Sequence, residues 1–334
     1  MSKENQTITA GQVSVKPGEV VHTEYEAGSI SGFPVRIPLS LINGSRPGPT
    51  LCISSGLHGC EYDSIEAAIR ITNAFSPDRI SGRLIVLPII NLPSFEQKTA
   101  FVNPLDNVNM NRIFPGDPKG TISRRIAQKI FSELVLQSNY LIDLHGGDLT
   151  ESIQSHVMVK ITGREEVDSM SRKMAEAFEE IPYQWELEVS GIPDYPGYPK
   201  GTITYEAPIR GIPAVTAEAG ERGKLEERSV RVLYDGMVNV MRLLGMLPED
   251  QAPKSRKKTV LRHGAIVAPS VGGLFYPSIS CGDRVEVGTK LGEIRGMRGE
   301  IRETLTSKTR GIVLSLVPLL PANIGEFVVL VVEL

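Results

Sequence analysis

Two residues that can bind a metal ion stand three positions apart in the segment SSGLHGCE. They are His58 and Glu61. Three residues make just under one turn of a helix, so the two side chains can face the same way. An imidazole nitrogen and a carboxylate oxygen are suitable zinc ligands, and a catalytic zinc site needs three protein ligands, with a fourth position left for water. The pair therefore predicts a catalytic metal site only if another segment supplies a third ligand.

The expected third ligand is His145, which ends the apolar segment YLIDLH and is followed by two glycines. Both metal-binding segments lie where a predicted buried strand ends, and the ligands of open α/β sheets gather at that edge. Asp143 precedes His145 by two residues, on the same face of the strand. Its carboxylate is suited to orient a ligand histidine through a hydrogen bond. A buried Asp that caps a nearby loop is the alternative interpretation.

Two further segments offer groups that a hydrolase needs. Glu218, in VTAEAG, follows an apolar run at another predicted strand end. A carboxylate close to a metal-bound water can act as the base and then as the acid. The alternatives are a solvent-facing Glu218, and Glu221 in its place. Asn111 and Arg112, in NMNRIFPG, offer amide and guanidinium donors, and a guanidinium binds a carboxylate with two hydrogen bonds. We expect Arg112 to anchor an acidic group of the substrate, with a structural ion pair as the alternative.

Alternating strands and helices are expected to position these residues. Continuous apolar runs are typical of strands that are covered on both faces. They predict strands at residues 50–56, 83–91, 140–145, 156–161 and 214–220. Helical spacing of apolar residues predicts helices at residues 61–75, 121–138, 165–180 and 226–245. This order indicates an α/β fold with a mainly parallel sheet and helices on both faces.

The pattern changes after Leu247. Residues 1–248 are expected to form the catalytic domain, and the polar, Pro-containing residues 249–262 a linker. Residues 263–334 contain short β-type runs separated by Gly and Pro, which predicts an all-β barrel or sandwich-like module.

Composition excludes several classes of protein. The chain has 334 residues, a net charge of −3 and three cysteines without C-x-x-C spacing. A nucleic-acid-binding protein would normally carry a basic surplus, and no apolar run approaches the length of about 20 residues that a membrane span needs. Sparse cysteines and a polar start without an apolar signal core predict a cytoplasmic protein with reduced thiols. We expect no nucleic-acid or membrane partner, and the sequence leaves a homo-oligomer open.

The segments GLHGCE, NMNRIFPG, YLIDLHGG and TAEAG, in this order, resemble the succinylglutamate desuccinylase/aspartoacylase family of the zinc carboxypeptidase superfamily. The resemblance implies a deacylase that removes acyl groups from small N-acyl amino acids or related amines. It further implies a zinc-carboxypeptidase-like fold, with a mixed, mainly parallel sheet and helices on both faces, followed by a β-rich domain that narrows access to the metal. It also implies roles for six residues: ligands of one zinc ion per chain at His58, Glu61 and His145, a general acid/base at Glu218, and substrate contacts at Asn111 and Arg112.

The sequence departs from this family at one position. Many members carry an extra arginine shortly before the Asn-Arg pair, where it polarises the scissile carbonyl. Residues 95–110 contain no arginine, and Thr99-Ala100-Phe101 stands where it is expected. Lys98 is one candidate replacement, and polarisation by zinc alone is the other. Loss of one oxyanion donor commonly costs about 10²–10³ in rate.

The sequence is also compatible with two other functions. One is a zinc carboxypeptidase that acts on short peptides, and the other is a zinc-retaining binding protein without catalytic activity. Residues 194–206, rich in Tyr, Pro and Gly, are expected to form a rigid substrate-lining or interface loop. The β-rich module also resembles half of a lipoyl or biotinyl carrier domain, but its candidate hairpin tip, residues 295–300, contains no lysine to carry a cofactor. We therefore expect it to be a scaffold or lid.

Overall fold

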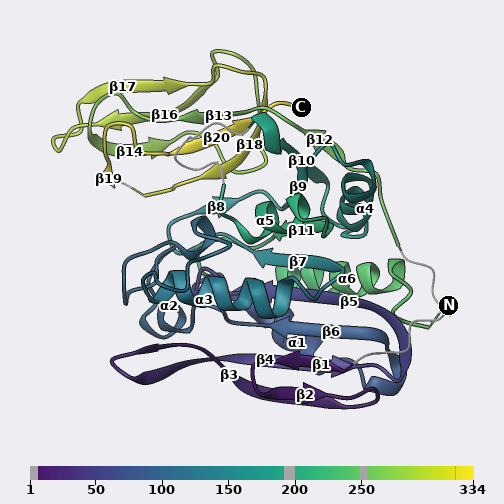
Figure 1. Cartoon of the computed structure of the whole chain (residues 1–334). Helices are drawn as coiled ribbons and strands as arrows, with labels where there is room; N and C mark the ends of the chain where they lie inside the picture. Colours follow the sequence, from purple (N-terminus) through teal and green to yellow (C-terminus); the bar gives the residue numbers. More distant parts are fainter. Residues whose placement is uncertain (1–6, 192–199, 249–253, 320) are drawn as a thin grey trace.

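A nine-stranded mixed sheet forms the centre of the larger part of the molecule (Figure 1). The computed structural model describes residues 7–191, 200–248, 254–319 and 321–334. In spatial order the strands are β12 (Thr259–Leu261), β10 (Tyr183–Glu188), β9 (His156–Ile161), β11 (Ala214–Glu218), β7 (Tyr140–His145), β5 (Arg46–Ser55), β6 (Ser81–Leu87), β4 (Phe33–Asn43) and β3 (Val20–Ile30). Five of the eight strand pairs are parallel, so the sheet is mixed and mainly parallel as expected.

The central strands are apolar throughout because each face of the sheet has its own core. Along β7, Leu141 belongs to one core and Ile142 to the other, since successive side chains of a strand point to opposite faces. The core on one face is covered by α1 (Tyr62–Thr72), α4 (Glu165–Glu176) and α6 (Glu227–Leu243). The opposite core is covered by α3 (Ile122–Ile130), the π-helical turn η3 (Phe131–Val135), α5 (Ile203–Ile209) and the small hairpin of β1 (Ile8–Ala10) and β2 (Val13–Val15).

Most predicted elements lie where the sequence places them, and some elements were not predicted. The strand at residues 140–145 has the predicted bounds. The pairing of β3 with β4 as a hairpin was missed, and so were β10 and the short helix α2 (Leu92–Gln97). The loop expected at residues 194–206 is partly wrong, because Thr202 caps α5 and residues 203–206 are helical. Residues 192–199 of that loop lie outside the described residues.

The C-terminal module consists of two antiparallel sheets that share one core. One sheet contains β13 (Gly264–Val267), β20 (Val329–Val332), β18 (Gly311–Leu316) and β15 (Arg284–Val285), and β8 (Ser152–Ile153) joins it from the larger part of the chain. The other contains β17 (Ile301–Thr306), β16 (Lys290–Arg295), β14 (Gly273–Pro277) and β19 (Pro321–Ala322). No sheet closes on itself within the described ranges, so the arrangement is sandwich-like and a barrel is not confirmed. Residues 259–261 of the expected linker form β12.

Direct contacts hold this module against the central sheet. β8 pairs with β18, and the Gln154 N–H donates to the Leu314 carbonyl at 2.8 Å. Trp185 and Leu187 of β10 share a hydrophobic cluster with Leu314. The module therefore lies over the end of the sheet that carries β9 and β10 (Figure 1).

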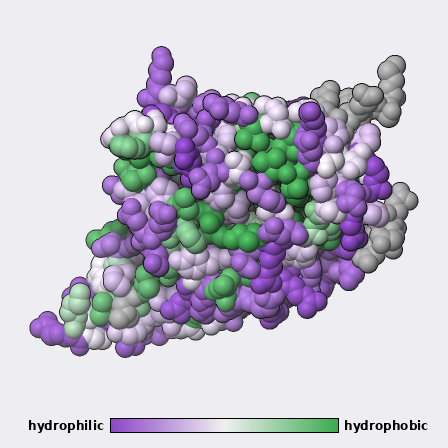
Figure 2. Space-filling view, turned by 90° about the horizontal axis from the view of Figure 1, so that it is seen from below, coloured by the Kyte–Doolittle hydropathy of each residue, from purple (hydrophilic) through white to green (hydrophobic). Residues whose placement is uncertain are grey.

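The face of the molecule shown in Figure 2 is mainly hydrophilic. On this face, hydrophobic residues form separate groups among hydrophilic ones. Within the part of the chain that the structure describes, no helix is long and apolar enough to cross a bilayer.

Candidate active site

A tight turn after β5 positions the first two candidate ligands. β5 ends at Ser55, and Gly56 follows with a φ of +63°, a left-handed conformation that favours glycine. A Cβ at Gly59 would come within 2.2 Å of the Phe95 nitrogen, so only glycine fits there. Glu61 occupies the N-cap position of α1. The turn brings the side chains of His58 and Glu61 to the carboxyl end of the strand.

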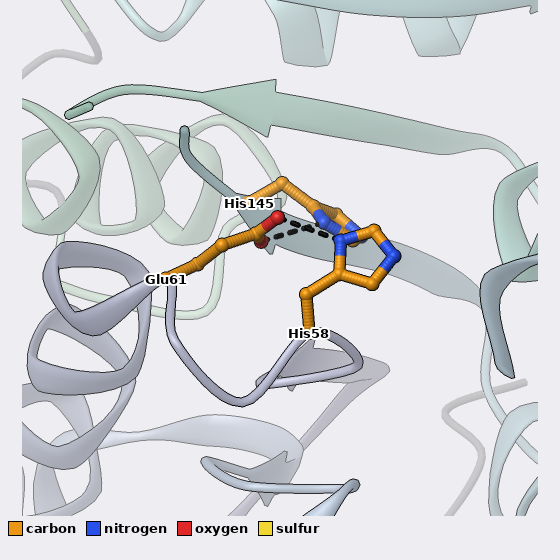
Figure 3. Close-up of side chains that lie close together, drawn as sticks. All are labelled: His58, Glu61 and His145. Atoms are coloured by element: carbon orange, nitrogen blue, oxygen red, sulfur yellow. Dashed lines mark hydrogen bonds and ion pairs between the residues drawn. The ribbon is translucent and has the colours of Figure 1, made fainter. Parts of the chain in front are cut away.

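The structure brings His58, Glu61 and His145 together, all buried (Figure 3). Nδ1 of His58 lies 2.6 Å from Oε1 of Glu61, and Nδ1 of His145 lies 2.8 Å from Oε2. One potential ligand atom from each residue lies within 4.8 Å of the other two. Three donors of types that zinc prefers thus converge from the ends of two adjacent parallel strands.

The outer nitrogens of both imidazoles have partners of their own. Nε2 of His145 lies 3.0 Å from Oδ2 of Asp143, which also accepts a hydrogen bond from the Ser54 hydroxyl on Oδ1. Nε2 of His58 lies 3.2 Å from Oδ1 of Asn109. If these oxygens accept N–H groups, the lone pair of each ring is on Nδ1 and points at Glu61.

The orientation of the two imidazoles around Glu61 favours a metal ion between them. Two nitrogen lone pairs aimed at a buried carboxylate repel it, and a cation between them would remove the repulsion. Protonated imidazoles act on the carboxylate in the same direction as a cation: although burial opposes ionisation, the charges and hydrogen bonds of His145 and His58 then lower the pKa of Glu61 to about 2. The donor set therefore fits a divalent cation, and its two nitrogens favour zinc over magnesium or calcium.

Glu218 stands beside these residues in the sheet. It ends β11, where its register partners are His145 on β7 and His156 on β9. Burial, together with the charges of nearby carboxylates and despite the opposing effect of His145, raises its pKa well above the usual range. Its carboxylate has no hydrogen-bond partner among the described residues. Glu221, the alternative, instead pairs with Lys224 at 3.0 Å.

Asn111 and Arg112 lie in the 3₁₀ turn η2 (Met110–Arg112), which Asn109 caps. Nδ2 of Asn111 is 3.3 Å from Nε2 of His145, and its Oδ1 is buried without a partner among the residues described. Arg112 donates through Nη1 to the Asn111 carbonyl at 2.7 Å, and its side chain is accessible from the cavity.

All six predicted residues line one cavity of about 570 Å³, a size typical of small-molecule sites. One end holds the His58–Glu61–His145 cluster, and the side chains of β9, β10 and β11 form a wall. Residues of the C-terminal module, among them Leu314 and Phe327, close another side.

Of Thr99-Ala100-Phe101, the residues that stand where the arginine is expected, Phe101 lines the cavity. Its ring meets that of His58 edge-on, with centroids 5.3 Å apart. Its φ of +59° is held by a 2.7 Å hydrogen bond from its N–H to Asp148. Lys98 is exposed and does not line the cavity, so it is not the replacement. The lysine that lines the cavity is Lys160, which sequence reasoning missed although a lysine inside the apolar strand HVMVKI was a signal.

Comparisons with known proteins agree with this architecture. The sequence model described as the succinylglutamate desuccinylase/aspartoacylase catalytic domain matches residues 47–244. An N-alpha-acetyl-L-2,4-diaminobutyric acid deacetylase from Halomonas elongata is 34% identical over 128 residues, which cover 37% of this chain and 37% of that relative.

Two solved structures match over nearly their whole length. A succinylglutamate desuccinylase/aspartoacylase from Rhodobacter sphaeroides has a TM-score of 0.86 at 23% identity, covering 97% of this chain and 98% of that one. The product-bound ectoine utilization protein EutE (DoeB) from Ruegeria pomeroyi has a TM-score of 0.86 at 24% identity, covering 99% and 100%. At these identities the structural matches show the fold alone.

Proposed function

Because the chain belongs to the succinylglutamate desuccinylase/aspartoacylase family, we propose that it is a zinc-dependent hydrolase that cleaves the amide bond of a small N-acyl amino acid. The observation that carries this proposal is the single cavity in which a metal-ligand set, a buried carboxylate and an accessible guanidinium meet. The Halomonas relative is a deacetylase of an acetylated diamino acid, which supports the class of substrate rather than its identity.

In the proposed site His58, Glu61 and His145 hold the zinc ion. When bound there, zinc supplies Lewis-acid chemistry that activates water and polarises a carbonyl oxygen. Asp143 and Asn109 fix the orientation of the two imidazoles, so that Nδ1 of each ring is kept for the metal. Phe101 covers one face of the site and excludes water from the side of His58.

Glu218 is the proposed general acid/base. A carboxylate whose pKa is raised by burial holds a proton more readily than a solvated one, which suits a group that takes a proton from water and delivers it to the leaving amine. Its place between His145 and His156 keeps it on the cavity face beside the metal ligands.

Arg112 and Asn111 are the proposed substrate contacts. The accessible guanidinium of Arg112 suits a carboxylate of the amino-acid part. The end of the Asn111 amide that points away from His145 has no partner in the described structure, and a polar group of the substrate would satisfy it.

A panel assay tests the proposal. The zinc-loaded protein is incubated with N-acetyl and N-succinyl L-amino acids and with dipeptides, and the released amine is measured. We expect acyl amino acids to be hydrolysed and dipeptides to be poor substrates. Turnover of dipeptides with all acyl amino acids inert would instead identify a carboxypeptidase. Bound zinc without any hydrolysis would identify a binding protein.

A further inference from the structure

Lys160 is a buried lysine on the wall of the cavity. Along β9, Val157 and Val159 point into the core, so the alternate residues His156, Met158 and Lys160 face the other side, where all three line the cavity. The Lys160 side chain is only 2% exposed. A long cationic side chain is almost never buried to this degree unless it is paired.

No partner of Lys160 is found in the described residues. Its ammonium makes no hydrogen bond or ion pair there, although it can donate three. Glu218 is the register partner of His156, four residues before Lys160 on β9, and so is not its direct neighbour. Burial and the nearby charge of Arg112, only partly opposed by Glu218, lower the pKa of Lys160 to about 7. The structure thus keeps a costly, unpaired donor at the cavity wall.

The second cation near Lys160 indicates what the pair would bind. Arg112 bonds only to its own neighbouring carbonyl in the described structure, and its charge is close enough to disfavour protonation of Lys160. The hydroxyls of Thr204 and Thr216 on the same cavity are 2.7 Å apart and satisfy each other. The charges of Glu151, Glu218 and Glu61 act on Arg112, but none of these carboxylates is bonded to Arg112 or Lys160 in the described structure. Two such cations on one cavity form a site for an anion with two acceptor oxygens.

We propose that Lys160 is a second substrate anchor, which binds the carboxylate of the N-acyl amino acid together with Arg112. This assignment rests on the proposed deacylase function. A carboxylate between the two cations removes their mutual repulsion and satisfies the Lys160 ammonium, so the site selects free acids over neutral amides.

The test compares a free acid with its neutral counterpart. The substrates are the N-acyl amino acid that the zinc-loaded wild type hydrolyses fastest in the panel and its α-carboxamide. The proteins are wild type, Lys160→Met, Lys160→Arg and, as a control, Lys98→Met, an exposed lysine outside the cavity. Circular dichroism and zinc content establish that each variant is folded and loaded.

For Lys160→Met, we expect KM for the free acid to rise about 10–100-fold, as for a lost hydrogen bond between charged groups, with kcat little changed. KM for the carboxamide should change less than about threefold, because that substrate lacks the charge. Lys160→Arg should restore most of the preference for the acid. Lys98→Met should have the same KM values as wild type for both substrates.

Two results overturn the assignment, and they differ from failure of the proposed function. If Lys160→Met changes KM equally for both substrates, Lys160 does not bind the carboxylate. If only kcat falls, Lys160 acts through Glu218 rather than on the substrate. If the wild type hydrolyses no acyl amino acid, the deacylase proposal itself fails, and the anchor fails with it.

Discussion

The metal-ligand cluster and the neighbouring wall of the cavity hold their charged groups in opposite ways. At the metal end, His58, Glu61 and His145 are all buried and bonded to one another or to neighbouring side chains. On the wall of β9 and β11, the charged ends of Lys160 and Glu218 make no hydrogen bond within the described structure, and both lie in surroundings that disfavour their charged forms.

The difference indicates which groups are held in place and which are kept for a ligand. A ligand set must keep its geometry before the metal arrives, so its members need supporting partners. Groups that exchange protons or bind a carboxylate must remain unpaired until the substrate enters, and they destabilise the fold until then. The predictions below test each side of this contrast.

Metal removal should have the largest effect. Dialysis against a strong chelator should reduce kcat/KM at least about 10³-fold, since the proposed metal would activate both the water and the carbonyl. One equivalent of Zn²⁺ should restore activity, and Mg²⁺ should not, because it prefers oxygen ligands. Full activity in the metal-free protein would contradict the proposed mechanism.

Glu218→Gln should have the second-largest effect on activity. The amide cannot take a proton from water, so kcat should fall about 10²–10⁴-fold, with zinc content unchanged. Glu221→Gln is the matched control, because Glu221 pairs with Lys224; it should keep near wild-type kcat. Loss of zinc in Glu218→Gln would show instead that Glu218 belongs to the supported end of the cavity.

Asp143→Asn should weaken the metal site without abolishing it. Asp143 orients His145 through a 3.0 Å contact, and loss of such a support typically lowers metal affinity about 10–100-fold. Competition with a chromophoric chelator measures the change. Unaltered affinity would mean that Asp143 is merely a buried Asp that bonds to Ser54.

Lys160→Met should stabilise the fold while it impairs binding of the acid. Since the pKa of Lys160 is lowered from 10.5 to about 7, the unfolded chain binds a proton between these pH values that the folded chain does not. The free energy of unfolding of the wild type should therefore rise as pH increases from about 7 to 10.5. Below pH 7 the buried Lys160 is protonated in the folded chain, and it destabilises the fold most there.

Urea unfolding of wild type and Lys160→Met checks the direction of this pH dependence. At pH 7 the variant should be more stable by about 1–3 kcal/mol, and the difference should shrink at pH 9. A variant less stable than wild type at both pH values would mean that Lys160 supports the fold.

The metal end of the cavity was readable from the sequence because its residues stand at strand ends next to glycines. The ends of β5 and β7 place His58 and His145 at one edge by topology alone. Asn109 was missed, although its role depends on a local cap of η2 that the segment NMNR already suggests.

The wall of β9 was only partly readable, since the lysine in its apolar sequence was a signal but the direction of its side chain was not. The strand HVMVKI looks buried on both faces, and only the antiparallel pairing of β9 with β11 shows that His156, Met158 and Lys160 face an open cavity. That pairing depends on long-range order in the sheet, which periodicity does not encode. The three residues of β12 were predicted to belong to the linker for the same reason. They form a strand only because they pair with β10.

Metal content per chain tests the central claim most directly. Wild type, His58→Ala, His145→Ala and the control His156→Ala, a cavity histidine outside the cluster, are purified in the presence of zinc and analysed by mass spectrometry. The account predicts one zinc ion per chain in wild type and His156→Ala, and below about 0.1 in the other two, since three protein ligands are required. Retention of one zinc ion by His58→Ala or His145→Ala would contradict it.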